Sequence, residues 1–195
     1  MSLEYAILGL LNYEPMTGYE IKKMVDISIS HFWPAVQSQI YKTLFRMETD
    51  GLVTVETVPQ EPRPPRKVYS ITPKGRDDLF QWLETPLPPG EIRIAWLIQI
   101  FFAGHLENEK ILALLHHLLA VQQHRLQAFT TIAEENRETM QEDAARDKFF
   151  WMLTVDYGVA QSIAQIDWLQ KVIRAVETHD YRLPTLADNL SHSDK

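Results

Sequence analysis

Polar and mildly basic side chains gather on one face of residues 38–49, a face with hardly any acid. Arginine and lysine can donate hydrogen bonds to guanine edges, glutamine can pair with adenine, and serine or threonine suits phosphates or either base. The first turns of a reading helix usually meet the base edges. This face is therefore chemically fit to read DNA, and its candidate residues are Ser38, Gln39, Lys42, Thr43 and Arg46. Gln37 is a further candidate in the first turns, although it lies closer to the apolar side.

The opposite face of the same stretch is apolar, which predicts a helix packed on a core. At about 100° per residue, four apolar side chains fall within an arc of about 80°: Val36, Ile40, Leu44 and Met47. Tyr41 and Phe45 flank this arc, and we expect them to close the core. The helix should begin near Ala35 and end at Gly51, in the left-handed cap position that glycine favours. Any amphipathic helix has a polar face, so this face alone does not establish DNA binding.

A second basic cluster follows in a proline-rich loop between two strand-like runs. Leu52–Val58 and Lys67–Ile71 both place β-branched residues at alternate positions, which is typical of strands. The loop between them, PQEPRPPR, holds four prolines that cannot join a ladder. The pattern predicts a two-stranded hairpin with a stiff basic tip that could reach a phosphate or the minor groove. The candidate residues are Arg63, Arg66 and Lys67.

Further helices are predicted before and after these elements. One covers Leu3–Leu11, and a capping box at Thr17–Glu20 starts the next. Thr72 followed by Pro73 is a clean helix start after the hairpin. Three helices followed by a two-stranded hairpin are the layout of a winged helix-turn-helix, in which the third helix enters the major groove and the hairpin lies on the backbone.

The second half of the chain predicts long helices. From Glu91 to about Asp180 there is no proline, and apolar residues follow a 3-4 spacing over 112–133 and again over 152–176. A second apolar stripe runs beside the first over residues 111–132. These stripes fit either a self-contained helical core or a homodimer interface. We favour the homodimer, because two neighbouring stripes are more than one intramolecular partner usually covers.

The prolines of residues 86–89 mark the expected domain boundary. The predicted fold class is mainly α, with a winged helix-turn-helix DNA-binding domain over residues 1–85, an all-α dimerisation domain over 90–180 and a polar tail over 181–195. The net charge is −7, but residues 1–84 hold 9 Lys and Arg against 11 Asp and Glu, whereas residues 85–195 hold 10 against 15. A nucleic-acid surface must therefore be a local patch in the first half.

Several other classes of function lack their sequence signatures. The absence of cysteine rules out a disulfide framework and thiolate sites, and no stretch approaches the roughly 20 apolar residues of a membrane span. The chain has no glycine-rich phosphate loop and no G-x-S-x-G elbow. His116, His117 and His124 share a helix without a carboxylate at the spacing of helical metal pairs. We expect a cytoplasmic protein that is not an enzyme and uses no metal or cofactor.

Four stretches give the sequence a family resemblance over nearly its whole length: LEYAILGLL, TGYEIKK, FWPAVQSQIYKTLFRMETDGLV and KVYSITPKGRDDLFQWL. The sequence resembles the PadR family of bacterial transcriptional regulators, in particular the subgroup with a long helical C-terminal domain. The resemblance implies a dimeric repressor with an N-terminal winged helix and C-terminal dimerisation helices. It also implies that DNA can be released on binding phenolic acids or other aromatic, hydrophobic compounds.

Aromatic residues near the predicted domain junction are the candidates for such an effector site. His31, Phe32 and Trp33 come just before the third helix, and Trp96 and Phe101 begin the second domain. Core packing is the alternative explanation for these residues. If they line a pocket, a flat hydrophobic ligand there could tilt the reading helices, and His31 could supply the polar group that such pockets include.

Together these observations predict a DNA-binding transcriptional regulator. We expect a homodimeric repressor that presents two third helices to an imperfect palindrome in double-stranded DNA and is released by a small aromatic or hydrophobic effector. The alternative is a winged-helix adaptor that binds proteins and never meets DNA, which the acidic balance would favour.

Overall fold

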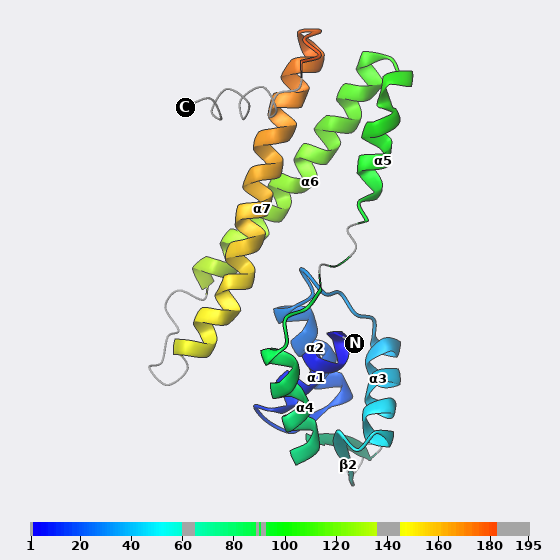
Figure 1. Ribbon diagram of the computed structural model, residues 1–195, viewed down its shortest axis with the longest axis vertical. Helices are drawn as coiled ribbons and strands as arrows, with labels where there is room; N and C mark the ends of the chain where they lie inside the picture. Colours follow the sequence, from blue (N-terminus) through cyan, green and yellow to red (C-terminus); the bar gives the residue numbers. More distant parts are fainter. Residues whose placement is uncertain (1, 60–64, 89, 91–92, 136–144, 183–195) are drawn as a thin grey trace. The chain divides into compact units, whose positions relative to one another are not determined.

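The computed structural model describes residues 2–59, 65–88, 90, 93–135 and 145–182 of the 195-residue chain (Figure 1). The chain forms two compact units, Met1–Gly90 and Glu91–Lys195. The described residues are mainly helical, with one small antiparallel sheet in the first unit. The tip of the predicted hairpin and most of the predicted polar tail, residues 60–64 and 183–195, lie outside the described residues.

The first unit contains four helices and a sheet within its described part. The helices are α1 (Ser2–Leu11), α2 (Gly18–Ser28), α3 (Gln37–Thr49) and α4 (Pro73–Glu84). The strands are β1 (Met16–Thr17), β2 (Val53–Val58) and β3 (Arg66–Ile71), in the order β1-β3-β2. The β2–β3 hairpin is the predicted wing. The sequence does not predict β1, because its two residues are too few to show an alternation.

The strand β1 ties the start of α2 to the wing. Thr17 pairs with Val68 and Met16 with Tyr69 in the antiparallel register of β1 and β3. Thr17 is also the N-cap of α2, where the predicted capping box is confirmed: its hydroxyl accepts from the Glu20 N–H at 3.2 Å, and Glu20 Oε2 accepts from the Thr17 N–H at 2.7 Å. The N-terminus of α2 is therefore fixed beside β3.

The core of the first unit is built from one stripe of each surrounding helix. Its fully covered members come from α1, α2 and α3, and each contributes roughly 1.5–3 kcal/mol by leaving water: Ile7, Leu8, Ile21, Val25, Ile40, Leu44 and Met47. The inward positions predicted for the last three are thus confirmed. Leu79 of α4 and Tyr69 of β3 complete this core.

Three residues expected to complete the apolar face of α3 do not do so. Val36 precedes the helix as its N-cap, since α3 begins at Gln37 rather than near Ala35. Tyr41 is 42% exposed and Phe45 is 72% exposed. The buried arc is already filled by neighbouring helices, and Phe45 is turned by about 100° from Leu44 around the helix.

Local caps fix the residues on either side of the wing, at the end of α3 and at the start of α4. Gly51 has φ 71°, as its predicted cap position requires, and the Leu52 N–H donates to the Met47 carbonyl at 2.8 Å. Thr72 caps α4 by accepting from the Gly75 N–H at 3.0 Å, and its hydroxyl donates to the Gly51 carbonyl at 2.8 Å. The end of α3 and the start of α4 are therefore tied together.

The second unit contains α5 (Ala95–Phe102), the short 3-10 helix η1 (Ala103–His105), α6 (Asn108–Glu135) and α7 (Ala145–Glu177). The long helices α6 and α7 lie side by side as an antiparallel pair (Figure 1). Leu115 packs with Leu169 and Ile173 in the core of this pair. Among the described residues, no helix is both long enough and apolar enough to cross a membrane.

The two 3-4 stripes of the second unit pack mainly on each other. Every member of the stripe over 112–133 in α6, and every member of the stripe over 152–176 in α7, is buried or half-buried within the single chain. Gly158 makes part of this packing possible, because a Cβ there would lie 2.4 Å from the Phe129 ring. The self-contained helical core, the interpretation we favoured less, therefore accounts for these two stripes.

Candidate nucleic-acid interface

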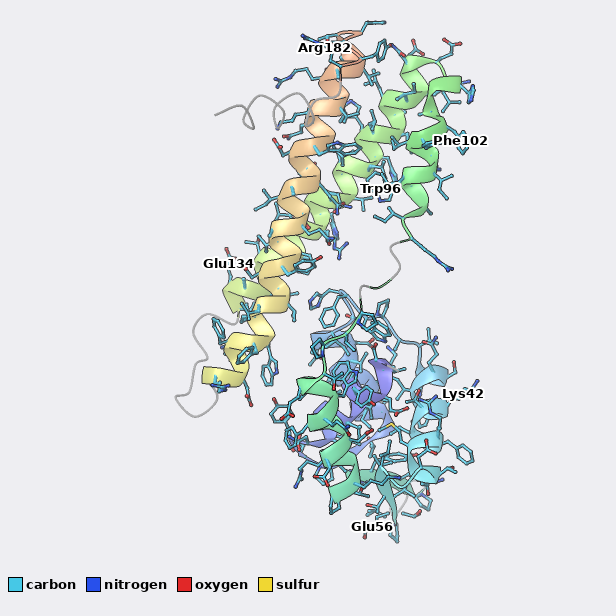
Figure 2. All side chains as sticks on the ribbon, viewed as in Figure 1. Lys42, Glu56, Trp96, Phe102, Glu134 and Arg182 are labelled. Atoms are coloured by element: carbon cyan, nitrogen blue, oxygen red, sulfur yellow. The ribbon has the colours of Figure 1, made fainter. Side chains whose placement is uncertain are left out.

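The outermost line of α3 carries the candidate base-reading residues. The direction opposite the buried arc passes among Ser38, Lys42, Phe45 and Thr49 at about 100° per residue. All four are exposed, and Lys42 projects from the outer side of α3 (Figure 2). Thr43 is half-buried because it lies nearer the core side. The hydroxyl groups of Ser38 and Thr49 and the ammonium group of Lys42 thus lie on the side of α3 that would face a DNA groove.

Gln39 is engaged at the start of its own helix. Its Oε1 accepts from the Val36 N–H at 3.0 Å, which satisfies a backbone donor that the helix leaves without an internal partner. Gln37, at the first helical position, is exposed. Contacting adenine through Gln39 would require this side chain to leave its cap.

Arg46 is engaged with α1. Its guanidinium forms an ion pair with the carboxylate of Glu4, whose side chain is 13% exposed while that of Arg46 is 40% exposed. The pair joins α3 to α1 across 42 residues of sequence. The predicted role of Arg46 in DNA contact would therefore compete with a structural role that the spacing within α3 does not reveal.

The described part of the wing base is basic. Arg66 and Lys67 are exposed at the start of β3, where Arg66 pairs with Val58 and Lys67 with Thr57 of β2. Arg63 lies outside the described residues.

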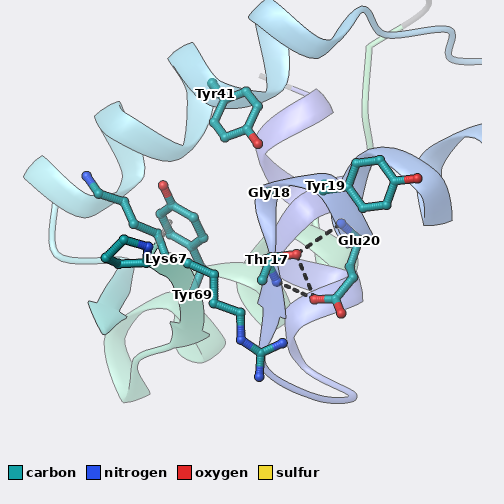
Figure 3. A pocket seen from close by; sticks show the side chains of 9 residues that line it. Thr17, Gly18, Tyr19, Glu20, Tyr41, Lys67 and Tyr69 are labelled. Carbon is teal, nitrogen blue, oxygen red and sulfur yellow. Dashed lines mark hydrogen bonds between the residues drawn. The ribbon is translucent and has the colours of Figure 1, made fainter. Parts of the chain in front are cut away.

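A cavity of about 370 Å³ opens between the wing base, the start of α2 and α3 (Figure 3). Gly18 allows the first turn of α2 to approach α3, because a Cβ there would lie 2.5 Å from the Tyr41 ring. Two cations and three phenol rings are among the residues that line it: Thr17, Gly18, Tyr19, Glu20, Tyr41, Pro65, Arg66, Lys67 and Tyr69. Cations, hydroxyl donors and a helix N-terminus are the groups that proteins place on DNA phosphates.

One acidic side chain, Glu20, lines this cavity together with the cations Arg66 and Lys67. Hydrogen bonds from the Thr17 backbone and hydroxyl, together with the charge of Arg66, lower the pKa of Glu20. Glu20 is therefore charged at neutral pH and offsets part of the positive potential of the wing base. Burial, followed by the nearby charge of Glu48, raises the pKa of Tyr69, so its hydroxyl stays protonated.

Sequence reasoning misses the three tyrosines of this cavity. Tyr41 flanks the apolar arc of α3, which favours a core position for it. Tyr69 stands on the buried side of β3, and only the folded chain brings it to the same cavity as Tyr41 of α3. The one local signal is the Thr17-Gly18-Tyr19 sequence, which places a small residue at a helix N-terminus.

The candidate effector residues are divided between the two units. In the first unit, His31 and Phe32 form an edge-to-face pair at 4.7 Å between ring centroids, and Trp33 is 41% exposed. In the second unit, Trp96 lies 6.0 Å from Trp168 of α7, while Phe101 is 81% exposed. The structure thus gives Trp96 a packing partner that is not among the candidates. A shared effector site for the five residues stays a prediction.

Comparisons with known proteins identify the family that this chain resembles and relatives that share its fold. Residues 7–81 match the transcriptional regulator PadR-like family, and residues 92–177 match the family described as virulence activator alpha C-term. A probable transcriptional regulator of Mycobacterium tuberculosis is 31% identical over 191 residues, which cover 91% of this chain and 98% of that protein. The negative transcriptional regulator PadR of Bacillus subtilis is 31% identical over 109 residues, 55% of this chain and 60% of that protein.

Solved structures of Bacillus subtilis PadR share the fold. Its complex with operator DNA has a TM-score of 0.80 and 24% identity, covering 90% of this chain and 99% of that chain. Its complex with p-coumaric acid has a TM-score of 0.77 and 23% identity, covering 91% and 99%.

Proposed function

The chain belongs to the PadR-like family of DNA-binding transcriptional regulators, and from this we propose that it is a homodimeric repressor released from its operator by a small aromatic or hydrophobic effector. The family consists of transcriptional regulators rather than enzymes. One observation carries the proposal. The helix α3 supplies both the exposed polar outer line and Tyr41 of the cavity that Arg66 and Lys67 line.

The proposed DNA contacts divide by chemistry. Ser38 and Lys42 on the outer line of α3 contact base edges in the major groove, and Gln37, Gln39, Thr43 and Arg46 remain candidates beside them. Arg63, Arg66 and Lys67 of the wing contact phosphates, which set affinity and register but carry no sequence information. The operator complex of Bacillus subtilis PadR, which has the same fold, supports this mode of binding.

The proposed dimer uses apolar surface that the single chain leaves uncovered. The helix α5 buries none of its residues fully, and four of its side chains line a shallow hollow of about 290 Å³: Leu97, Ile98, Phe101 and Phe102. On α7, Phe149, Phe150 and Tyr157 are all exposed to at least half of their surface. Such apolar surface typically marks an interface. We therefore place the dimer contact on α5 and α7 rather than on the stripes that pack together.

The effector and the sign of regulation are proposed by analogy. Bacillus subtilis PadR is a negative regulator, and one of its structures contains p-coumaric acid. A flat aromatic acid is therefore the first effector class to test. The adaptor alternative lacks comparable support, because the described outer line of α3 is mostly polar.

Selection of bound sequences from random DNA with the purified protein tests the proposal. The expected result is an imperfect palindrome whose two half-sites lie about one helical turn, or a multiple of it, apart. Affinity for the selected duplex should fall with salt, as phosphate neutralisation requires. The addition of p-coumaric acid or a related phenolic acid should release the duplex. Recovery of no enriched sequence and no salt-dependent shift on any duplex would leave the adaptor as the better account.

A further inference from the structure

Phe45 is an apolar side chain that the described part of the fold leaves largely uncovered. It is 72% exposed, and no other large apolar side chain in the described part of the first unit is more exposed. It lies on α3 about 100° from Leu44 and about 130° from the middle of the buried arc, beside the outer line. Its neighbours along the outer line are Lys42 and Thr49, both exposed and polar.

The surroundings of Phe45 favour a small apolar target over a protein partner. Interfaces between proteins cover contiguous apolar patches with an apolar centre. Phe45 has one aromatic neighbour on α3, Tyr41 one turn before it, which is 42% exposed and lines the cavity beside the wing. Its other neighbours one turn away, Lys42, Glu48 and Thr49, are polar and exposed. So small an apolar surface matches a single apolar group better than an apolar protein patch.

The major groove of B-DNA presents one such group at its base edges, the C5-methyl of thymine. A phenyl ring has no hydrogen-bonding group, so it cannot distinguish the nitrogen and oxygen atoms of the other base edges. Hydroxyl and ammonium groups at Ser38 and Lys42 suit those atoms instead. The outer line of α3 therefore combines hydrogen-bond donors with one group suited to a methyl.

We propose that Phe45 is a specificity determinant that contacts the methyl group of one thymine in each operator half-site. This inference rests on the proposed function, in which α3 enters the major groove. It adds an apolar contact to a reading surface that is otherwise predicted from hydrogen-bonding side chains alone.

The test replaces thymine by uracil, which removes only the methyl group, at each position of the selected operator in turn. Wild-type protein should lose affinity at one position per half-site by about fourfold, the equivalent of burying one methyl-sized group at about 0.8 kcal/mol. Phe45→Ala should bind the thymine operator more weakly than wild type. It should also show no further loss when that thymine becomes uracil, because the two changes remove the same contact.

Two variants make the outcome specific. Phe45→Leu keeps an apolar side chain and should retain the preference for thymine over uracil. Phe80 of α4 is another exposed phenyl ring of the first unit, 46% exposed. Phe80→Ala should leave the preference for thymine over uracil unchanged. Circular dichroism and thermal unfolding should show all three variants folded.

Two results would overturn the assignment of Phe45. One is an equal loss on uracil substitution in wild type and Phe45→Ala, which would mean that another residue meets the methyl. The other is full operator affinity in Phe45→Ala. Failure of the proposed function is a separate outcome, recognised when the wild-type protein itself shows no salt-dependent binding to any duplex.

Discussion

Lys42 is the residue that we propose for a guanine contact, because it is exposed on the outer line of α3. Lys42→Ala should lower operator affinity by roughly 5- to 100-fold, because removal of a base contact costs about 1–3 kcal/mol. Binding to random DNA should change little. Titration of both duplexes measures the two affinities. Lys110→Ala, at an exposed lysine of α6, is the matched control. An equal loss on both duplexes would make Lys42 a phosphate contact.

Gln39 combines a local role with its predicted role in reading bases, and two substitutions separate them. Gln39→Ala removes the acceptor for the Val36 N–H and should lower the free energy of unfolding by about 0.5–1 kcal/mol, a value typical of removed caps. Gln39→Glu keeps that acceptor but loses the amide donor needed for adenine. It should unfold like wild type and bind the operator weakly. Denaturant unfolding and operator titration provide the two readouts, and tight operator binding by Gln39→Glu would exclude the adenine contact.

Glu20 is expected to weaken DNA binding, because its charge faces the cations of the wing base. Glu20→Gln keeps an acceptor for the Thr17 N–H and should strengthen binding to operator and random DNA alike, by roughly two- to threefold at low salt. The pKa of Glu20 is lowered, so wild type keeps this charge at neutral pH. The difference between the two proteins should vanish only as the pH falls through the folded-state pKa of Glu20. A difference that persists after protonation would point to a weakened cap instead.

At the scale of single elements, the wing should supply affinity without sequence preference. Replacing Arg63, Arg66 and Lys67 by Ala should weaken binding about equally on operator and random DNA. The slope of log affinity against log salt should flatten by roughly one unit for each phosphate that the variant no longer neutralises. Titrations over a range of salt concentrations measure the slope. Collapse of the operator-to-random ratio would show that the wing reads bases.

The pairing of α6 with α7 depends on Gly158, where a Cβ would meet the Phe129 ring. Gly158→Ala should destabilise the second unit by about 1–3 kcal/mol, the usual cost of overpacking. Adding Phe129→Ala should make the cost of the glycine substitution smaller, so the two changes should not be additive. Gly104→Ala is the control, because nothing lies within 4 Å of a Cβ there. Thermal unfolding distinguishes these variants, and equal stability of wild type and Gly158→Ala would contradict the packing argument.

The elements that the sequence predicts well are those whose signals are local. Capping residues such as Thr17 and Thr72 determine helix starts through bonds to residues three positions away. The strand β1 is missed because its two residues show no alternation and its partner lies some fifty residues further along the chain. The predicted positions of Tyr41 and Phe45 are wrong because residue type does not show which side of a helix the rest of the fold will cover. The 3-4 spacing likewise identifies the apolar stripes of α6 and α7, but it does not show that the two stripes pack on each other.

At the scale of the whole molecule, we expect a particle of twice the chain mass of 22.7 kDa. Ile98→Glu combined with Phe101→Glu places charge on the exposed face of α5 and should yield a monomer. Operator affinity should then fall far more than affinity for random DNA, because two linked reading helices no longer act together. Light scattering at micromolar concentration measures the mass, with Phe80→Glu as the control on α4. A wild-type monomer, or a double variant that remains dimeric, would contradict the proposed interface.

The two-residue strand β1 also determines how this protein could be recombined with its relatives. Met16 and Thr17 precede α2 in the chain but pair with Tyr69 and Val68 of the wing. A chimaera that exchanged only β2 and β3 would pair a foreign strand with native β1 and reshape the cavity beside α2. An exchange that includes the wing should therefore also include Met16 and Thr17, so its first crossover point belongs before Met16.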